Sequence, residues 1–300
     1  MAISKFIEDN RNIFEPIIKW VKEITKMGTV YTHSGLFHAD ETACLAFLRI
    51  FGYDGEYRRV RELPPESEGC MAFDIGLGPY DHHQAEPRRR ESGKFKGKAY
   101  ASLGLIIQAC GILKIPGFET WDSDFVAYLD QGDTSEGPKG EIARHITKFN
   151  PGVDENLDVT ECFEDAVLYM RLTLEGEIRD RLRKYLSEKK LVECINTAEL
   201  HVHTQYGDLI VLPCFLYWQT AAKELGLAGV IFPSDRDPGY WNVVVIDQLQ
   251  IAESDCKRRF TDPLVGFVHP MKFMAVLANY EEAIRVAERI QLRPSITHTT

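Results

Sequence analysis

The sequence Thr-His-Ser-Gly-Leu-Phe-His-Ala-Asp-Glu occupies residues 32–41, followed by Phe-Asp-Ile-Gly at 73–76 and Tyr-Asp-His-His-Gln at 80–84. The first two segments continue from short apolar runs that are typical of buried strands, and a loop with glycine and proline leads to the third. Parallel α/β sheets bind their ligands at the carboxyl ends of the strands. We therefore expect an α/β fold with a parallel sheet, in which the three segments meet at one sheet edge.

The side chains that would meet there are histidines and aspartates, namely His33, His38, Asp40, Asp74, Asp81, His82 and His83. A mixture of imidazole and carboxylate suits manganese, iron or zinc better than magnesium or calcium, which prefer oxygen ligands. The three segments contain no cysteine, which argues against a structural zinc site. A carboxylate shared by two such groups is what a two-metal centre needs, since its ions lie about 3.5–4 Å apart. The alternative, polar loop residues with Asp40 capping a helix, explains three such segments in this order less well.

These motifs resemble those of the DHH phosphoesterase superfamily, which contains RecJ-type exonucleases, oligoribonucleases and family II inorganic pyrophosphatases. The first motif of that superfamily usually reads His-x-x-x-Asp-x-Asp, whereas this chain has His33-x-x-x-x-His38-x-Asp40. Together with Asp-His-His at 81–83, this variant is similar to the Myg-type exonuclease branch, formerly described as metal-dependent protein hydrolases. The resemblance extends from about Thr29 to Glu288.

The resemblance implies two groups of metal ligands that share one aspartate. One ion would be held by His33, His38 and Asp74. The other would be held by Asp40, Asp74, His82 and Asp133. Asp133 matches the family's fourth motif, Asp-x-x-Asp-Asn-Gly, although the chain departs from that motif at Thr134 and Ser135. Asp130 is therefore kept as the alternative ligand.

The same resemblance implies residues that act on the substrate. His83 would contact a phosphate or act as an acid, and Asp81 would orient a histidine. Arg144 lies in a segment similar to the family's Arg-x-x-x-x-Asn-Pro, so it would reach a phosphate or form a structural salt bridge. His269 matches the family's Phe-Val-His and would contact the substrate or be a buried structural histidine. The Gly-Gly of the family is replaced here by Phe-Met-Ala at 273–275.

Two short basic stretches stand out in an acidic chain. The denser stretch directly follows the Asp-His-His segment and consists of Arg88, Arg89 and Arg90. We expect it to clamp a phosphate backbone and to close as a lid, with a solvated loop as the alternative. The other stretch lies on an expected strand at 56–62 and consists of Arg58, Arg59 and Arg61. We interpret it as a solvated sheet edge.

The length of 300 residues predicts two domains. We expect a helical extension at 1–27, a catalytic domain with a helical spacer at 28–190, and a smaller α/β substrate-binding lobe at 191–300, with the active site between the two lobes. Apolar residues at helical spacing predict a helix over 3–26 that breaks or restarts at Pro16.

Composition narrows the class of protein. The net charge of −10 argues against a general nucleic-acid coat and favours short substrates. Seven cysteines without paired spacing predict reduced thiols. We expect neither a signal peptide nor a membrane span, which needs about 20 apolar residues. The sequence therefore predicts a cytoplasmic protein without membrane association. A homodimer is a possible oligomeric state.

These features predict a two-metal-dependent phosphoesterase that hydrolyses phosphodiester bonds and binds two divalent ions. Mn²⁺ is the first choice of metal, with Mg²⁺, Fe²⁺ or Zn²⁺ as alternatives. The resemblance implies a 3′–5′ exonuclease acting on RNA or short oligonucleotides. A hydrolase of a small phosphorylated metabolite, such as a nucleotide or pyrophosphate, is one alternative, and a catalytically silent metal- or nucleotide-binding scaffold is another. A protein hydrolase would use a single open zinc site, which the doubled carboxylate set disfavours.

Overall fold

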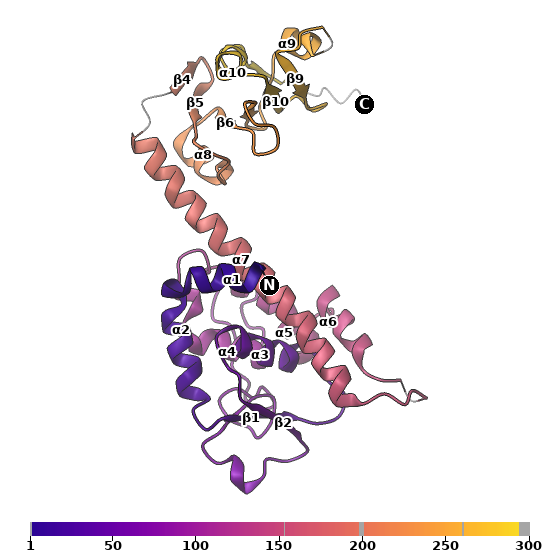
Figure 1. Ribbon diagram of the computed structural model, residues 1–300. Helices are drawn as coiled ribbons and strands as arrows, with labels where there is room; N and C mark the ends of the chain where they lie inside the picture. The colour runs from indigo at the N-terminus through magenta and orange to yellow at the C-terminus, as the bar shows by residue number, and fades with distance from the viewer. Residues whose placement is uncertain (1, 153, 198–200, 260, 294–300) are drawn as a thin grey trace. The chain divides into compact units, whose positions relative to one another are not determined.

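The computed structural model describes residues 2–152, 154–197, 201–259 and 261–293, and it divides into two compact units, Met1–Leu182 and Arg183–Thr300 (Figure 1). The division falls inside the long helix α7 (Val159–Thr197), whereas the sequence placed the domain boundary at residue 190. A continuous helix carries the same local pattern on both sides of such a division, so its sequence does not mark the boundary. No helix of the described residues has both the length and the apolar composition needed to cross a membrane.

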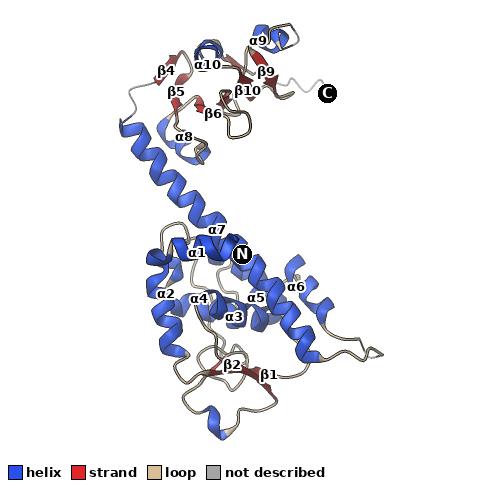
Figure 2. Ribbon diagram, in the orientation of Figure 1, coloured by secondary structure: helices blue, strands red, loops and turns tan. Residues whose placement is uncertain are grey.

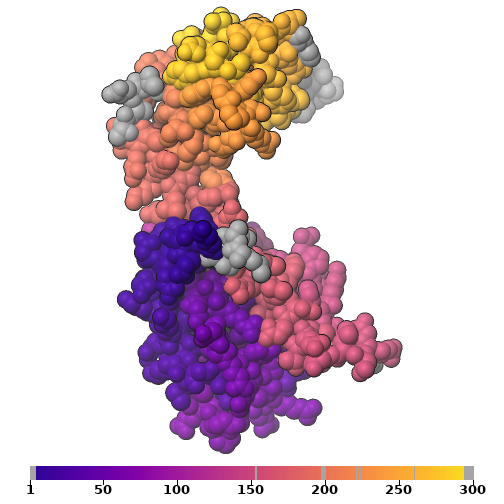
Figure 3. Space-filling model, viewed as in Figure 1, coloured from indigo at the N-terminus to yellow at the C-terminus, as the bar shows by residue number. Residues whose placement is uncertain are grey.

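Unit 1 begins with two helices, α1 (Ala2–Asp9) and α2 (Arg11–Ile24). The helical prediction for this segment placed the break at Pro16, but the structure places it at Asn10, and Pro16 lies inside α2. Proline removes one backbone hydrogen bond from a helix. The helix continues because its apolar face is fully packed, with buried Phe14, Ile17, Ile18 and Val21. Part of the outer surface of these helices is seen in indigo in the space-filling view (Figure 3).

The described strands of unit 1 form a three-stranded parallel sheet in the order β2-β1-β3. They are β1 (Thr29–His33), β2 (Glu56–Val60) and β3 (Met71–Ala72). The crossover between β1 and β2 contains α3 (Ala39–Ile50), as a parallel connection requires. His33 pairs with Val60 at the carboxyl ends of β1 and β2, and Asp74 follows β3. The predicted α/β class with a parallel sheet is thereby confirmed.

Helices of unit 1 pack against one another beside this sheet. They are α4 (Ser102–Cys110), α5 (Ala127–Thr134), α6 (Glu141–Ile146), the first part of α7, short 3-10 turns at Pro65–Ser67, Ile112–Lys114 and Thr147–Phe149, and a π-helical turn at Asp122–Val126. α3 packs against α4 and α5. Its residues from Ala39 to Leu48 are all buried, so its first turn, which carries two acidic residues, lies inside the unit.

The described residues of unit 2 form a six-stranded mixed sheet in the order β4-β5-β6-β7-β10-β9. Strands are drawn in red in Figure 2. Its strands are β4 (His201–Thr204), β5 (Gly207–Val211), β6 (Gly229–Pro233), β7 (Trp241–Val245), β9 (Val265–Val268) and β10 (Met274–Leu277). Its other elements are α8 (Gln219–Leu225), α9 (Glu253–Arg258), α10 (Tyr280–Ala287) and the strand pair β8 (Leu249–Gln250) and β11 (Gln291–Leu292).

Alternate strand residues of unit 2 enter two separate apolar clusters. Leu209 and Ile231 belong to the cluster that contains Ala283 and Val286 of α10. Their neighbours Ile210 and Val230 belong to the cluster that contains Ala222 of α8. Because successive side chains of a strand point to opposite faces, α10 and α8 cover opposite faces of this sheet.

Candidate metal centre

The buried first turn of α3 holds two carboxylates. Asp40 and Glu41 are both 0% exposed. The backbone N–H of His38, which precedes the helix, donates to the Glu41 carboxylate at 2.7 Å. The backbone N–H of Ser102, at the start of α4, donates to Asp40 Oδ2 at 3.3 Å. Since helix N-termini favour negative charge, these backbone positions stabilise carboxylates that would otherwise be costly to bury.

Asp74 lies between histidines from two different segments. Its carboxylate is 3.0 Å from His33 Nε2 and 3.3 Å from His82 Nδ1. Its backbone has a positive φ of 57°, a left-handed conformation that aspartate tolerates better than most side chains. The backbone N–H of Asp74 donates to the carbonyl of Tyr80 at 3.1 Å, which helps to hold this conformation. The local backbone therefore directs the Asp74 carboxylate to the central position of the cluster.

Four side chains assigned by resemblance to one ion come together in the structure. They are Asp40, Asp74, His82 and Asp133, each of which offers a ligand atom within 4.8 Å of the others. His82 Nε2 is 2.7 Å from Asp133 Oδ2, and His82 Nδ1 is 3.8 Å from Asp40 Oδ2. These residues come from α3, the loop after β3, the Asp-His-His segment and α5, so only the tertiary fold makes them neighbours.

A second group of ligand atoms is formed by His33, His38 and Glu41. His33 Nε2 lies 3.1 Å from Glu41 Oε1 as well as close to Asp74. The resemblance names Asp74 for this group and does not name Glu41. The signal that would have found Glu41 is its place next to Asp40, in the first turn of an otherwise apolar helix.

Asp133 and Asp130 have different surroundings. Asp130 is 0% exposed, accepts a hydrogen bond from Arg90 at 2.6 Å, and is the acceptor for the backbone N–H of Gly104 at 3.3 Å. It belongs to none of the potential metal clusters among the described residues, whereas Asp133 belongs to one. The alternative assignment of Asp130 as a ligand is therefore set aside, because its carboxylate is already occupied.

The electrostatics of the cluster fit a bound cation. Burial raises the pKa of Asp40 well above its usual range, and the nearby charges of Asp74, Asp133 and Glu41 raise it further. Burial likewise raises the pKa of Asp74. Within the described structure, Asp40 Oδ1, Glu41 Oε2 and Asp74 Oδ1 are buried and have no hydrogen-bond partner. Such oxygens are rare in folded proteins, and divalent ions would give them partners and offset the repulsion between carboxylates.

The histidines of the cluster respond to the same carboxylates. Burial opposes the charged form of His33, but hydrogen bonds to Asp74 and Glu41 outweigh it and raise the pKa of His33 to about 11. Burial also opposes the charged form of His82, and the hydrogen bond to Asp133 raises its pKa. Both imidazoles are therefore held in strongly negative surroundings.

Asp81 holds His83 at the mouth of this cluster. Its Oδ1 accepts from the backbone N–H of His83 at 3.0 Å and lies 2.8 Å from His83 Nδ1, while Oδ2 accepts from the N–H of Leu77 at 2.7 Å. Burial alone would raise the pKa of Asp81, but the two backbone N–H groups lower it. The His83 side chain is 58% exposed, and its ring lies 4.1 Å from that of His82. It also lines a cavity of about 510 Å³ together with His33, His38, Asp74, Asp133 and Lys139.

The stretch Arg88–Arg90 is not a uniform surface. Arg88 and Arg89 are exposed, but Arg90 is only 4% exposed and bonds to Asp122 at 2.7 Å and to Asp130 at 2.6 Å. The expectation that all three arginines face a substrate is therefore corrected for Arg90, because its charge is paired with two carboxylates inside the unit. The stretch lines a separate cavity of about 680 Å³, which shares no lining residue with the cavity of the metal cluster.

Arg144 and His269 are the other expected substrate contacts, and the structure describes the local surroundings of each. Arg144 is exposed on α6. His269 lies in unit 2, where its Nδ1 accepts from the N–H of Met271 at 3.1 Å and its ring lies 4.2 Å from Phe273. Both stay predictions.

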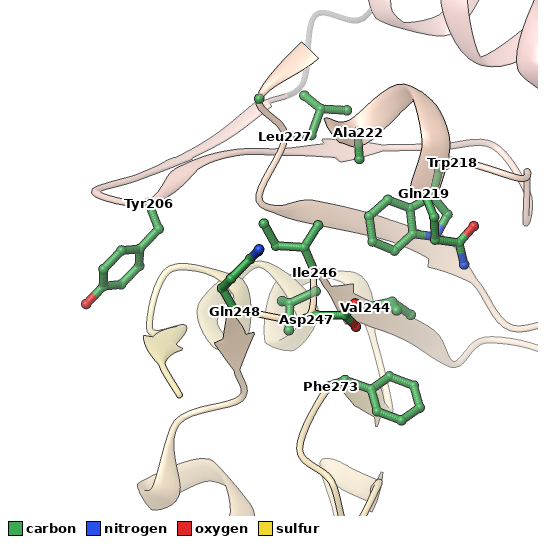
Figure 4. Close-up of a pocket in the computed structure, with 12 residues that line it drawn as sticks. Tyr206, Trp218, Gln219, Ala222, Leu227, Val244, Ile246, Asp247, Gln248 and Phe273 are labelled. Carbon is green, nitrogen blue, oxygen red and sulfur yellow. The ribbon is translucent and has the colours of Figure 1, made fainter. Parts of the chain in front are cut away.

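Unit 2 has a pocket of its own, of about 630 Å³. Figure 4 shows that Trp218, Ile246 and Phe273 contribute apolar side chains to it, and that Gln219 and Asp247 contribute polar groups. His269 does not line this pocket.

No family model matches the chain. The MYG1 protein YER156C of Saccharomyces cerevisiae is 27% identical over 251 residues, which cover 69% of this chain and 73% of that protein. This similarity is consistent with the resemblance to the Myg-type branch. A solved structure of RecJ from Thermus thermophilus in complex with Mg²⁺ matches at 15% identity with a TM-score of 0.27, covering 91% of this chain. The chain spans about half (50%) of that RecJ chain.

Proposed function

We propose that this protein is a two-metal-dependent phosphoesterase that hydrolyses phosphodiester bonds. One observation carries the proposal: Asp40, Asp74, His82 and Asp133 place ligand atoms within 4.8 Å of one another, and buried carboxylate oxygens of this region have no hydrogen-bond partner among the described residues. Histidine and carboxylate ligands around one shared aspartate are the donor set of a two-metal centre.

The residues that would hold the two ions fall into two groups around Asp74. One group is His33, His38 and Asp74, with Glu41 added from the structure. The other is Asp40, Asp74, His82 and Asp133. When bound, two divalent ions activate a water molecule and offset the charge that develops on the phosphoryl oxygens. Mn²⁺ is our first choice of metal, with Mg²⁺, Fe²⁺ and Zn²⁺ as alternatives.

The chain's own groups would position the substrate and move a proton. Asp81 accepts from His83 and fixes the orientation of its ring, which leaves the other ring nitrogen free to act. At the rim of the cavity, that nitrogen would donate a proton or a hydrogen bond to a phosphate oxygen. The ammonium of Lys139, in the same cavity, adds positive charge for an anionic substrate.

The finer proposal is a 3′–5′ exonuclease acting on RNA or short oligonucleotides. The similarity to the MYG1 protein supports it, and so do exposed basic residues of unit 1. We keep Arg88, Arg89 and Arg144 as proposed contacts to the phosphate backbone of the substrate. His269 is kept as a proposed substrate contact from unit 2. A homodimer and a cytoplasmic location also stay predictions.

A second candidate, hydrolysis of a small phosphorylated metabolite, is favoured by one feature. The cavity at the metal cluster measures about 510 Å³, and the densest basic run lines a different cavity. A volume of this order suits a single small ligand, so a nucleotide or pyrophosphate would fit there.

The test is incubation of the purified protein, with Mn²⁺ and with EDTA, with end-labelled RNA and DNA from dinucleotides to about thirty nucleotides, a length beyond one protein binding site. Nucleoside phosphates and pyrophosphate form a parallel series. Stepwise metal-dependent shortening supports the exonuclease, and release of phosphate from small compounds alone supports the second candidate. The variant His82→Ala should be inactive, whereas His203→Ala, at an exposed histidine of unit 2, should be active. Absence of hydrolysis by protein that binds two ions would leave a silent scaffold.

Metal content tests the shared role of Asp74. Asp74→Asn should lose both ions, because its carboxylate contacts histidines of both groups. Asp133→Asn should lose one, since we propose Asp133 as a ligand in only one of the two sets, although its Oδ1 also lies 3.1 Å from His38 Nδ1 of the other set. Elemental analysis of protein equilibrated with Mn²⁺ measures this directly. Two ions per chain in Asp74→Asn would refute the bridging assignment.

A further inference from the structure

A second cavity of unit 1 also reaches His33. It measures about 710 Å³, and its lining includes His33, Gly35, Tyr57, Arg59 and Arg61. His33 also lines the cavity of the metal cluster, so the two cavities have one wall residue in common. Because β1 and β2 are parallel and in register, the strand end that carries His33 lies beside Val60, with Arg59 and Arg61 on either side of it.

The guanidinium of Arg59 is held in a defined position. It donates to the carbonyl of Gly35 at 2.8 Å, and its Cζ lies 4.5 Å from the ring centre of Phe163 and 5.4 Å from that of Phe37. An arginine stacked on aromatic rings keeps its planar fork in one orientation. Arg59 is therefore arranged before any ligand arrives.

The charge of Arg59 is not neutralised by an ion pair. Among the described residues, no carboxylate forms a salt bridge with Arg59, and its buried Nε has no hydrogen-bond partner. Burial lowers the pKa of Arg59, which is the sign of a charged group held partly out of water, and the charge of Glu41 opposes this effect only in part. A half-buried cation with unused donors is costly unless an anion binds it.

Its neighbour Arg58 provides the contrast. Arg58 is exposed and pairs with Glu56 at 2.9 Å. It points to the other face of β2, because side chains alternate along a strand. Arg61, directly after the end of β2, is exposed and lines the same cavity as Arg59. The basic stretch was expected to be a solvated edge, but two of its residues, Arg59 and Arg61, line the cavity beside His33.

We propose that this cavity binds a phosphate group of the substrate next to the one that is hydrolysed, with Arg59 as the principal contact and Arg61 as the second. The inference rests on the proposed function and narrows its substrate class to compounds that carry at least two neighbouring phosphates. The guanidinium of Arg59 can bind two oxygens of this second phosphate. Substrates that carry the second phosphate should therefore bind more tightly than substrates with a single phosphate.

The test compares Arg59→Met with the matched control Arg58→Met on three substrates with Mn²⁺: a 5′-phosphorylated dinucleotide, the same dinucleotide without its 5′-phosphate, and bis-p-nitrophenyl phosphate, which has a single phosphate. For the first, Arg59→Met should lower kcat/KM by about 10- to 100-fold, mainly through KM, the range expected for a lost charge-assisted hydrogen bond. For the other two substrates, kcat/KM of Arg59→Met should stay within about twofold of the wild-type value. Arg58→Met should change none. Equal losses on all three substrates, or no loss on any, would overturn the inference.

Two further measurements separate this inference from its premises. Arg59→Lys keeps the positive charge but lacks the planar guanidinium. Its kcat/KM for the 5′-phosphorylated dinucleotide should lie between those of the wild type and Arg59→Met. Thermal unfolding must show that all variants are folded. Calorimetric titration of pyrophosphate into EDTA-treated protein measures binding without turnover. If the wild type hydrolyses nothing, loss of pyrophosphate binding in Arg59→Met but not in Arg58→Met supports the cavity while the proposed function fails. Equal pyrophosphate binding by both variants would overturn the inference in that case.

Discussion

Arg59 and Arg90 both lie over an aromatic ring in unit 1, but the structure surrounds their charges in opposite ways. Arg90 lies 4.2 Å from the ring centre of Tyr100 and is paired with Asp122 and Asp130. Arg59 lies 4.5 Å from the ring centre of Phe163 and has a backbone carbonyl as its partner. The arginine from the denser basic run is thus the structural one. An arginine is available to bind an anion only when no nearby carboxylate already pairs with it. The number of basic residues next to it in the sequence does not show whether such a carboxylate is present.

Arg90→Met should give the largest effect on stability. It leaves the carboxylates of Asp122 and Asp130 without their partner, and removing one side of a buried ion pair costs about 3–5 kcal/mol of unfolding free energy. Urea unfolding at pH 8 measures this loss. Arg89→Met is the control, because Arg89 is 49% exposed and its pair with Glu136 should contribute no more than about 1 kcal/mol. Equal, small losses in both variants would contradict the structural role of Arg90.

The pH dependence of stability sharpens the description of the Arg90 network. Burial raises the pKa of Asp130 from 3.8 to about 7, although Arg90 opposes the shift. Between these values the folded chain holds a proton on Asp130 that the unfolded chain has released, so stability falls as pH rises through this range. Relative to Asp130→Asn, which cannot titrate there, the wild type should lose up to about 1.4 kcal/mol per pH unit between pH 4 and 7. Denaturant unfolding at a series of pH values tests this, and parallel curves for the two proteins would contradict it.

Phe163→Leu should give the smallest change in free energy of these variants. It tests the stacking that holds the Arg59 guanidinium. The substitution removes the ring beneath the guanidinium, a contact that contributes about 0.5–1 kcal/mol at partly exposed sites. KM for the 5′-phosphorylated dinucleotide should rise about 2- to 5-fold with kcat unchanged. Phe118→Leu is the control, since Phe118 is equally buried in unit 1. A similar rise in KM for both variants would mean that general loosening of the core, and not the stacking, is responsible.

The two arginines also show how far prediction from the sequence reaches at this site. Strand-end placement brought His33, Asp74 and His82 into one expected cluster, and the structure does place them side by side. Glu41 was missed, because its role depends on the distance to His33 and not on its place in a motif. Arg90 was assigned to the surface because its partner Asp130 is far away in sequence.

The sequence by itself determined the α/β class and the identity of the side chains that gather at the carboxyl ends of the strands. Both follow from local information, since strand periodicity and motif spacing are properties of neighbouring residues. The tertiary structure alone decided which acidic and basic groups neutralise one another, that α2 continues through Pro16, and that no carboxylate of the described residues pairs with Arg59. The physical reason is that burial and charge pairing depend on distances in space between residues that are far apart along the chain.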